Sequence, residues 1–318
     1  MKILVTGSSG HLGEALMRVL KAQGKDVLGI DILASPYTDR VGSIADKQFV
    51  KENMRGVSHV LHTATLHKPH VATHVQQQFI DTNITGTLNL LEVSVEHGVG
   101  SFIFTSTTST FGDALTPGPD TPAAWITEDV VPIPKNIYGV TKTAAEDLCR
   151  LFYRNHHLPC IVLKTSRFFP EEDDDHAIAT NYTDANVKAN EYLYRRVDTE
   201  DVVNAHLLAM EKASQIGFSK YIISATTPFG KDHLWALRKN APGVVGSLYP
   251  EFEKIYAGRG WKMFPTIGRV YVNKKAREEL GWKPKYDFQF ILDQLKNGQE
   301  FKSELAEMIG SKGYHRQL

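Results

Sequence analysis

The sequence has few cysteines and no long hydrophobic run. Cys149 and Cys160 are the two cysteines among 318 residues, too few for a disulfide framework or a four-cysteine zinc site. They favour a reducing, cytoplasmic setting, and we expect both side chains in the core. No apolar stretch reaches the ~18 residues that a membrane-spanning helix needs. Met1–Gly7 also lacks the features of a leader peptide, so we expect no membrane partner.

A surplus of charge of either sign is also missing. Lys and Arg number 36, as do Asp and Glu, and the pI is near 7.2. A balanced chain has no long-range field that attracts nucleic acid or an anionic membrane. We therefore expect a small-molecule substrate and no nucleic acid. Hydrophobic residues make up 42% of the chain, and at roughly 150 residues per domain the length predicts about two domains or one large α/β unit.

The first half alternates short apolar runs with longer amphipathic segments. This pattern is typical of repeated strand–helix–strand units around a parallel sheet. The predicted strands are Lys2–Val5, Asp26–Ile30, His59–His62, Ser101–Thr105 and Cys160–Leu163. The predicted helices are Leu12–Gln23, Val75–His97 and Ile137–Asn155. We therefore predict an α/β fold built on a doubly wound parallel sheet, the Rossmann fold.

The alternation breaks after Leu163. Thr110–Pro134 and the polar, acidic stretch Pro170–Asn190 are predicted to be loops, whereas Val202–Met210 predicts a helix and Tyr221–Ser224 a further strand. The remaining residues predict short helices in a smaller module. We expect a dinucleotide-binding domain over residues 1–168, to which residues 198–226 return. A smaller C-terminal substrate-binding module takes residues 169–197 and 227–318.

A glycine motif follows the first predicted strand. The sequence Thr6-Gly-Ser-Ser-Gly-His-Leu-Gly13 lies between a strand and a helix, where glycines let backbone N–H groups approach a pyrophosphate at the helix N-terminus. Asp31 ends the second strand, and a carboxylate there accepts hydrogen bonds from the adenosine ribose and repels a 2′-phosphate. The motif predicts a dinucleotide site and favours NAD over NADP, although Arg40 leaves NADP open.

A tyrosine and a lysine are spaced four residues apart in a predicted helix. Tyr138 and Lys142 would share a helix face, so that the ammonium can lower the pKa of the phenol and reach a cofactor ribose. A phenol tuned in this way is a general acid/base for a hydroxyl or carbonyl. The preceding strand ends in hydroxyl residues at Thr105–Thr108, at the sheet edge where α/β proteins bind ligands.

Together these motifs resemble the extended short-chain dehydrogenase/reductase family, also called the NAD-dependent epimerase/dehydratase family. Further similarities are His62-Thr-Ala64, Asn83-Ile-Thr-Gly-Thr87 and Leu280-Gly-Trp-Lys-Pro284. The resemblance implies a cofactor site formed by Gly7, Ser9, Gly10, His11, Leu12, Gly13, Asp31, Ile32, Ser43, Ile44, Thr63, Ala64, Thr65, Asn83, Thr105, Tyr138, Lys142 and Phe168. Ser43 stands where the family usually has an aspartate.

The resemblance also implies catalytic and substrate residues. Tyr138 would be the acid/base, Lys142 would orient the ribose, and Thr107, or Thr108 if the register differs by one, would hydrogen-bond the reacting oxygen. The implied substrate-binding residues are His67, His70, Thr107, Thr108, Phe169 and Arg195. We expect no metal site, because His67, His70 and His74 are most simply loop histidines and Glu171–Asp175 a solvated acidic loop. The family also implies a homodimer through the helices Val75–His97 and Ile137–Asn155.

Departures from the family narrow the predicted reaction. Thr107 is followed by Thr108-Ser109 rather than by the Asp-Glu pair of sugar-nucleotide dehydratases, which disfavours dehydration. Pro170 replaces the asparagine of nucleotide-sugar epimerases, and the following insertion is short and acidic. We therefore predict NAD-dependent, reversible hydride transfer at a secondary alcohol or ketone of a small sugar-like or hydroxy-carbonyl substrate. A nucleotide-sugar epimerase with tightly bound NAD and a non-catalytic, dinucleotide-sensing binding protein are the alternatives.

Overall fold

A twisted parallel sheet forms the centre of the protein. The computed structural model describes residues 1–172 and 176–313, and within these ranges the main sheet has seven strands in the order β3-β2-β1-β4-β5-β7-β8, all parallel to their neighbours. They are β1 (Lys2–Thr6), β2 (Asp26–Asp31), β3 (Arg40–Val41), β4 (Val57–His62), β5 (Ser101–Thr107), β7 (Cys160–Thr165) and β8 (Phe218–Ile223). This confirms the predicted doubly wound sheet.

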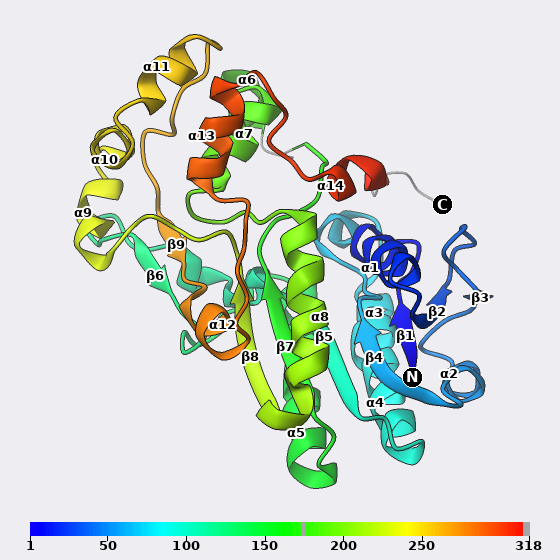
Figure 1. Ribbon diagram of the computed structural model, residues 1–318. Coiled ribbons are helices and arrows are strands. Elements are labelled where there is room, and N and C mark those ends of the chain that lie inside the picture. Colours follow the sequence, from blue (N-terminus) through cyan, green and yellow to red (C-terminus); the bar gives the residue numbers. More distant parts are fainter. Residues whose placement is uncertain (173–175, 314–318) are drawn as a thin grey trace.

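Helices cover both faces of the sheet (Figure 1). One face packs against α1 (His11–Ala22) and α8 (Thr199–Ile216), and the other against α2 (Lys47–Asn53), α4 (Gly86–Glu96) and α5 (Ile137–His156). The predicted strands carry continuous apolar residues because they are buried on both faces. Cys149 and Cys160 are free and buried in the second of these cores, as predicted.

The predicted helix Val75–His97 is interrupted. It consists of α3 (Gln76–Phe79), a π-helical segment over Ile80–Thr85, and α4. The π-helical segment carries Asn83, whose side chain bonds the backbone of Leu66 instead of facing solvent. Such single-turn π segments are frequent at functional sites. The two-residue edge strand β3 was not predicted, because it is too short and too exposed to leave a pattern.

Two segments predicted as loops contain regular structure. Within Pro170–Asn190 lie α6 (His176–Asn181) and α7 (Asp184–Glu191), so the loop prediction is wrong there. The polar residues of α7 are used internally, since the Asn186 and Asn190 side chains both donate to the carbonyl of Lys262. Thr110–Pro134 contains β6 (Ala124–Ile126), which pairs in parallel with β9 (Arg269–Tyr271). Residues 173–175 of the predicted acidic loop lie outside the described residues.

The C-terminal part of the chain forms a small helical module with its own core (Figure 1). Its helices are α9 (Leu234–Leu237), α10 (Ala241–Leu248), α11 (Phe252–Ala257) and α13 (Phe288–Lys296). Two further helices, α12 (Lys274–Glu279) and α14 (Glu304–Ile309), pack instead into the core beside α1 and α8. The buried Trp282 donates to the Asp201 carbonyl on α8, which fixes the Leu280–Pro284 motif against the sheet domain.

A buried histidine should make folding stability depend on pH. His206 donates from Nδ1 to the Val202 carbonyl at 2.8 Å, so Nε2 accepts from the Thr105 hydroxyl at 2.7 Å and the ring is neutral. Burial lowers the pKa of His206 to about 4. Since the unfolded chain binds this proton near pH 6.5, the stabilisation is present above pH 6.5 and is lost as the pH falls toward 4.

We expect the His206→Gln variant to lose less stability than wild type between pH 7 and pH 4.5, by on the order of 2 kcal/mol. The free energy of unfolding in urea at both pH values measures the difference. His156→Gln, at an exposed position of α5, is the matched control and should keep the wild-type dependence. An unchanged pH dependence in His206→Gln would contradict the prediction.

Candidate active site

One cavity lies at the carboxyl ends of the parallel strands. Its volume is about 1150 Å³, slightly above the range that is typical of drug-sized ligand sites. The predicted cofactor and substrate residues that line it are Gly7, Ser9, Gly10, His11, Leu12, Gly13, Asp31, Ile32, Ser43, Ile44, Thr63, Ala64, Thr65, His67, His70, Thr105, Thr107, Thr108, Tyr138, Phe168, Phe169 and Arg195. Of the predicted site residues, Asn83 and Lys142 lie behind this lining.

The glycine turn between β1 and α1 leaves room for a ligand close to the backbone. Gly7 has a φ of +72°, and a Cβ on it would lie 2.7 Å from the amide nitrogen of Ala64. A Cβ on Gly13 would lie 1.9 Å from the carbonyl oxygen of Gly7. The turn therefore excludes side chains at these positions and exposes the N-terminus of α1 to the cavity, which is the arrangement a pyrophosphate requires.

Asp31 at the end of β2 is held in place by the backbone. Its two carboxylate oxygens accept from the amide of Ser9 at 3.0 Å and the amide of Leu33 at 2.9 Å. Each oxygen keeps a further lone pair for a ribose hydroxyl. Arg40 lies on β3, donates to the carbonyl of Asp39 and does not line the cavity. The geometry around Asp31 thus fits the two hydroxyls of the adenosine ribose of NAD better than the ribose 2′-phosphate of NADP.

Tyr138 and Thr107 meet at the other end of the cavity. Tyr138 lies in the first turn of α5, whose N-terminus is capped by the Asn136 side chain accepting from the Gly139 amide at 3.0 Å. Thr107, the last residue of β5, lines the same cavity as Tyr138 and acts to lower the pKa of its phenol. Thr107 Oγ1 accepts from the Ser109 amide at 3.1 Å. Thr108 lines the cavity as well, so the assignment of the catalytic hydroxyl to Thr107 stays a prediction.

Burial rather than Lys142 dominates the pKa of Tyr138. Burial raises this pKa to about 12, and Thr107 only partly opposes the rise. Burial lowers the pKa of Lys142 to about 7, against the attraction of Glu146. Lys142 Nζ donates to the Thr105 carbonyl at 2.7 Å and lies 4.0 Å above the Phe104 ring. Sequence spacing predicted the shared helix face, but burial decides the pKa values.

A fully buried carboxylate lies one helical turn beyond Lys142. Glu146 accepts from Lys164 Nζ at 2.6 Å, from Lys220 Nζ at 2.8 Å and from the Ser106 hydroxyl at 2.5 Å. Lys164 also donates to Thr110 at 2.6 Å. Spacing alone gave no sign of this network, because its members come from α5, β5, β7 and β8. It fixes the helix that carries the tyrosine to the strand that carries the threonine.

Asn83 contacts the helix of Tyr138 without lining the cavity. Its Nδ2 donates to Thr141 Oγ1 on α5 at 3.0 Å and to the Leu66 carbonyl at 2.9 Å, and its Oδ1 accepts from the Leu66 amide at 2.9 Å. Asn83 holds the segment after β4 against α5, whereas its direct contact with a cofactor stays a prediction.

Three histidines of the segment after β4 lie close together. The ring centroids of His67 and His70 lie 4.7 Å apart, and those of His70 and His74 lie 4.8 Å apart. Burial, with a smaller contribution from His70, lowers the pKa of His67 to about 3, so this ring is neutral at physiological pH. His67 also stacks edge-on against Phe169 at 5.9 Å. The group forms an aromatic, hydrogen-bonding wall of the cavity.

The C-terminal segment closes over the glycine turn. His11 Nε2 lies 2.9 Å from a carboxylate oxygen of Glu171, which also accepts from the amide of Lys312 at 2.9 Å. Hydrogen bonds from His11 and Lys312 outweigh burial and bring the pKa of Glu171 to about 2. Lys312 also pairs with Glu14 on α1. Sequence reasoning assigned Glu171 to a solvated loop, but here it joins the insertion to the cofactor end.

Several lining residues were missed because they come from distant segments. Examples are Ser166 after β7, Arg269 and Tyr271 on β9, and Lys312 near the C-terminus. The alternation Arg269-Val270-Tyr271, with Val270 fully buried, is a weak strand signal that places the two polar residues on one side. For Ser166 and Lys312 we find no signal in the sequence.

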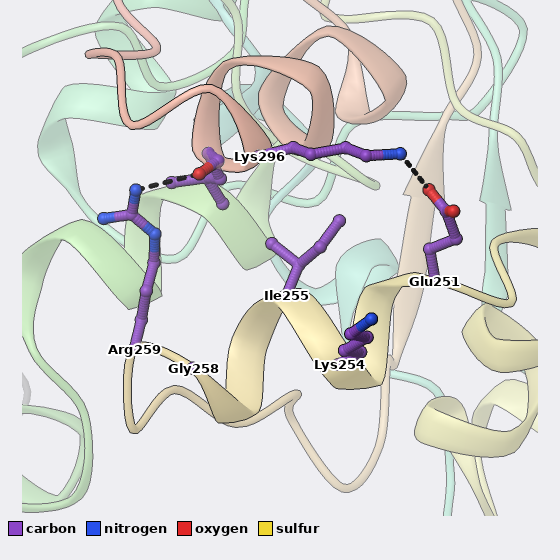
Figure 2. A pocket seen from close by; sticks show the side chains of 7 residues that line it. Glu251, Lys254, Ile255, Gly258, Arg259 and Lys296 are labelled. Carbon is purple, nitrogen blue, oxygen red and sulfur yellow. Dashed lines mark hydrogen bonds and ion pairs between the residues drawn. The ribbon is translucent and has the colours of Figure 1, made fainter.

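A second hollow lies in the C-terminal module, away from these residues. Figure 2 shows that Lys296 Nζ donates to Glu251 across it at 2.9 Å and that Arg259 donates to the Leu295 carbonyl at 3.0 Å. Glu251, Lys296 and Arg259 are thus already engaged. Among residues 1–172 and 176–313, no group of three or more His, Cys, Asp or Glu side chains is arranged to hold a metal ion. In the same ranges, no helix is long and apolar enough to cross a membrane.

The parallel sheet and the glycine turn, with Tyr138 and Thr107 at the strand ends, define a dinucleotide-binding α/β protein. The model of the NAD dependent epimerase/dehydratase family matches residues 3–223. The chain belongs to this family and is an enzyme of the extended short-chain dehydrogenase/reductase type. The resemblance found from the motifs is confirmed, and NAD, which the family description names, agrees with the predicted cofactor.

Full-length relatives support the assignment. The chain is 26% identical to the UDP-glucose 4-epimerase of Lactobacillus helveticus, over 90% of this chain and 93% of the relative. It is similar in structure to a short-chain dehydrogenase/reductase superfamily protein from Agrobacterium tumefaciens with bound NAD, with a TM-score of 0.67, 23% identity and coverage of 93% and 96%. The UDP-glucose 4-epimerase of Thermotoga maritima gives a TM-score of 0.64 at 23% identity, with coverage of 94% and 100%. The structural likenesses show the fold.

Proposed function

We propose that this enzyme reversibly oxidises a secondary alcohol of a small sugar-like or hydroxy-carbonyl substrate, with Tyr138 as the acid/base. The observation that carries the proposal is that Tyr138 and Thr107 line the same cavity as the glycine turn. Gly7, Gly10 and Gly13 would hold the pyrophosphate and Asp31 the adenosine ribose. Bound NAD would accept a hydride from the carbinol carbon and, in an epimerase, return it.

The residues of this chain then have distinct tasks. Thr107 donates a hydrogen bond to the reacting oxygen, and Tyr138 takes the hydroxyl proton as the carbonyl forms. Lys142, held by the Thr105 carbonyl, has a pKa near 7 and so exchanges protons readily at physiological pH. Its protonated form would favour the phenolate next to it. In the proposed division of the chain, residues 1–168 and 198–226 bind the dinucleotide, and residues 169–197 and 227–318 bind the substrate.

Replacing the phenol should separate catalysis from binding. In Tyr138→Phe we expect kcat to fall by roughly 10²- to 10⁴-fold, because the general acid/base is lost, while the Kd for NAD stays within about twofold. NADH formation with a panel of sugars, sugar acids and UDP-glucose measures turnover, and calorimetry measures NAD binding. Tyr249→Phe, a tyrosine of the C-terminal module outside the cavity, is the matched control. Unchanged turnover in Tyr138→Phe would remove Tyr138 from the mechanism.

Nucleotide-sugar 4-epimerisation is the second candidate, and the full-length relatives favour it. An epimerase oxidises and reduces the same carbon and therefore has no need to release its cofactor. A dehydrogenase must exchange NAD and NADH in every cycle. The two reactions thus differ in how firmly the purified protein retains NAD.

We expect the purified protein to contain less than stoichiometric NAD and to bind added NAD reversibly. The protein is denatured, the released nucleotide is identified and counted, and the stripped protein is titrated with NAD and NADP. One NAD per chain retained through purification would contradict the dehydrogenase and favour the epimerase. Tighter binding of NADP than of NAD would contradict the role of Asp31.

We also propose that the enzyme is a cytoplasmic homodimer. The support is a row of exposed apolar side chains on neighbouring segments of one face: Val75 beside α3, Ile80 on the π-helical segment, and Val140 and Leu151 on α5. Val75 and Val140 are 67% and 49% exposed. Apolar groups gathered in this way are typical of an interface, and the two free, buried cysteines suit a reducing compartment.

Light scattering at micromolar concentration should give the mass of a dimer for wild type and a lower mass for Leu151→Glu, because a charge would be buried in the interface. Met308→Glu, which changes an exposed apolar residue on α14 instead, should remain dimeric. A monomeric wild-type protein would contradict the proposal.

A further inference from the structure

Three chain segments that are distant in sequence run side by side at one wall of the cavity. The Arg167 amide donates to the Arg195 carbonyl at 3.2 Å, and the Tyr271 amide donates to the Tyr194 carbonyl at 3.1 Å. The segments after β7 and before α8 and the strand β9 therefore lie in adjacent rows. Ser166, Arg195 and Arg269 all contribute to the lining of the cavity from these rows.

Arg269 differs from the other arginines at this wall in its partners. Arg195 and Arg167 each form an ion pair with the buried Glu191, at 2.6 Å and 3.2 Å. Arg269 forms no ion pair with any described residue, and its guanidinium lies 6.0 Å from the centre of the Tyr271 ring. Its Nε is shielded from solvent and has no hydrogen-bond acceptor within residues 1–172 and 176–313. It is a cavity-facing cation that lacks a carboxylate partner.

A second polar group at the same wall also lacks a partner. Ser166 is 3% exposed, and its Oγ has no hydrogen-bond partner in the described part of the chain. Its backbone amide donates to the Ile223 carbonyl at 2.9 Å, which holds the backbone of Ser166 in place. Among the described residues, nothing occupies the hydrogen-bonding capacity of its hydroxyl. A buried hydroxyl without a partner costs free energy, and a ligand in the cavity would remove that cost.

We propose that Arg269 and Ser166 bind an anionic group of the substrate, either a carboxylate or a phosphate. The inference rests on the proposed function, since it identifies the class of molecule that the same cavity takes. A guanidinium has donors only, and its planar fork matches the two oxygens of a carboxylate or phosphate. The hydroxyl of Ser166 supplies one more donor. A neutral sugar hydroxyl would leave the charge of Arg269 uncompensated.

The two sources of the anion are distinguished by the probe. Glucuronate and galacturonate carry a carboxylate, with glucose and galactose as their uncharged counterparts, and UDP-glucose carries a diphosphate, with uridine as its uncharged counterpart. Binding is measured by calorimetry on the full chain in the presence of NADH, which prevents oxidation of the probe. We expect at least one anionic probe to bind wild type more tightly than its counterpart does.

In Arg269→Gln we expect the Kd of that probe to rise by about 10- to 100-fold, with no change for the uncharged counterpart. Ser166→Ala should raise it by about two- to tenfold. Arg259→Gln, in the separate hollow of Figure 2, is the matched control and should bind as wild type does. An unchanged Kd for NADH shows that each variant is folded. If Arg269→Gln does not fold, Arg269→Lys takes its place and should weaken binding by an intermediate factor.

Wild-type affinity of Arg269→Gln for the anionic probes would overturn the proposal, as would the failure of every anionic probe to bind wild type more tightly than its counterpart. Either result leaves the proposed oxidation intact if Tyr138 is still required for the turnover of a neutral sugar. Conversely, selective anion binding that depends on Arg269 would stand even if Tyr138→Phe kept full activity.

Discussion

The buried carboxylate of Glu146 is the contact on which the geometry of the site depends. It joins α5 to three strands through Ser106, Lys164 and Lys220, with distances of 2.5 to 2.8 Å. Removing one partner of such a buried group typically costs about 3 to 5 kcal/mol, because an uncompensated charge remains. Since α5 carries Tyr138 and β5 carries Thr107, the relative position of these two residues is fixed by charged groups that do not line the cavity.

Burial also shifts the pKa values of two residues of α5. It raises the pKa of Tyr138 to about 12 and lowers the pKa of Lys142 to about 7, so both groups are biased toward their neutral forms. Burial therefore has a larger effect on these two pKa values than the spacing of the residues along α5, because the charged form of a side chain is disfavoured where water is excluded.

The sequence was sufficient to predict those parts of the candidate site that depend on a short local pattern. The glycine turn, Asp31 at a strand end and the Tyr138–Lys142 spacing are such patterns, and the structure places all of them at one sheet edge. It was insufficient where distant segments meet. The polar stretch before Glu191 lacks the apolar spacing that indicates a helix. Its asparagines are buried polar residues that bond the backbone of Lys262, and this distant partner is not visible in the local sequence. The pKa of Tyr138 likewise depends on burial, which spacing does not report.

The two ends of the cavity differ in how they are built. The dinucleotide end consists mainly of the turns after β1, β2 and β4, against which the C-terminal Lys312 bonds Glu14 and Glu171. The opposite wall combines residues after β7, before α8 and on β9, joined by backbone hydrogen bonds and by the ion pair of Arg167 with Glu191. Ser166 and Arg269 contribute no contact to the glycine turn and no hydrogen bond to Glu146. This separation lets substrate preference change while the acid/base and the cofactor site stay the same.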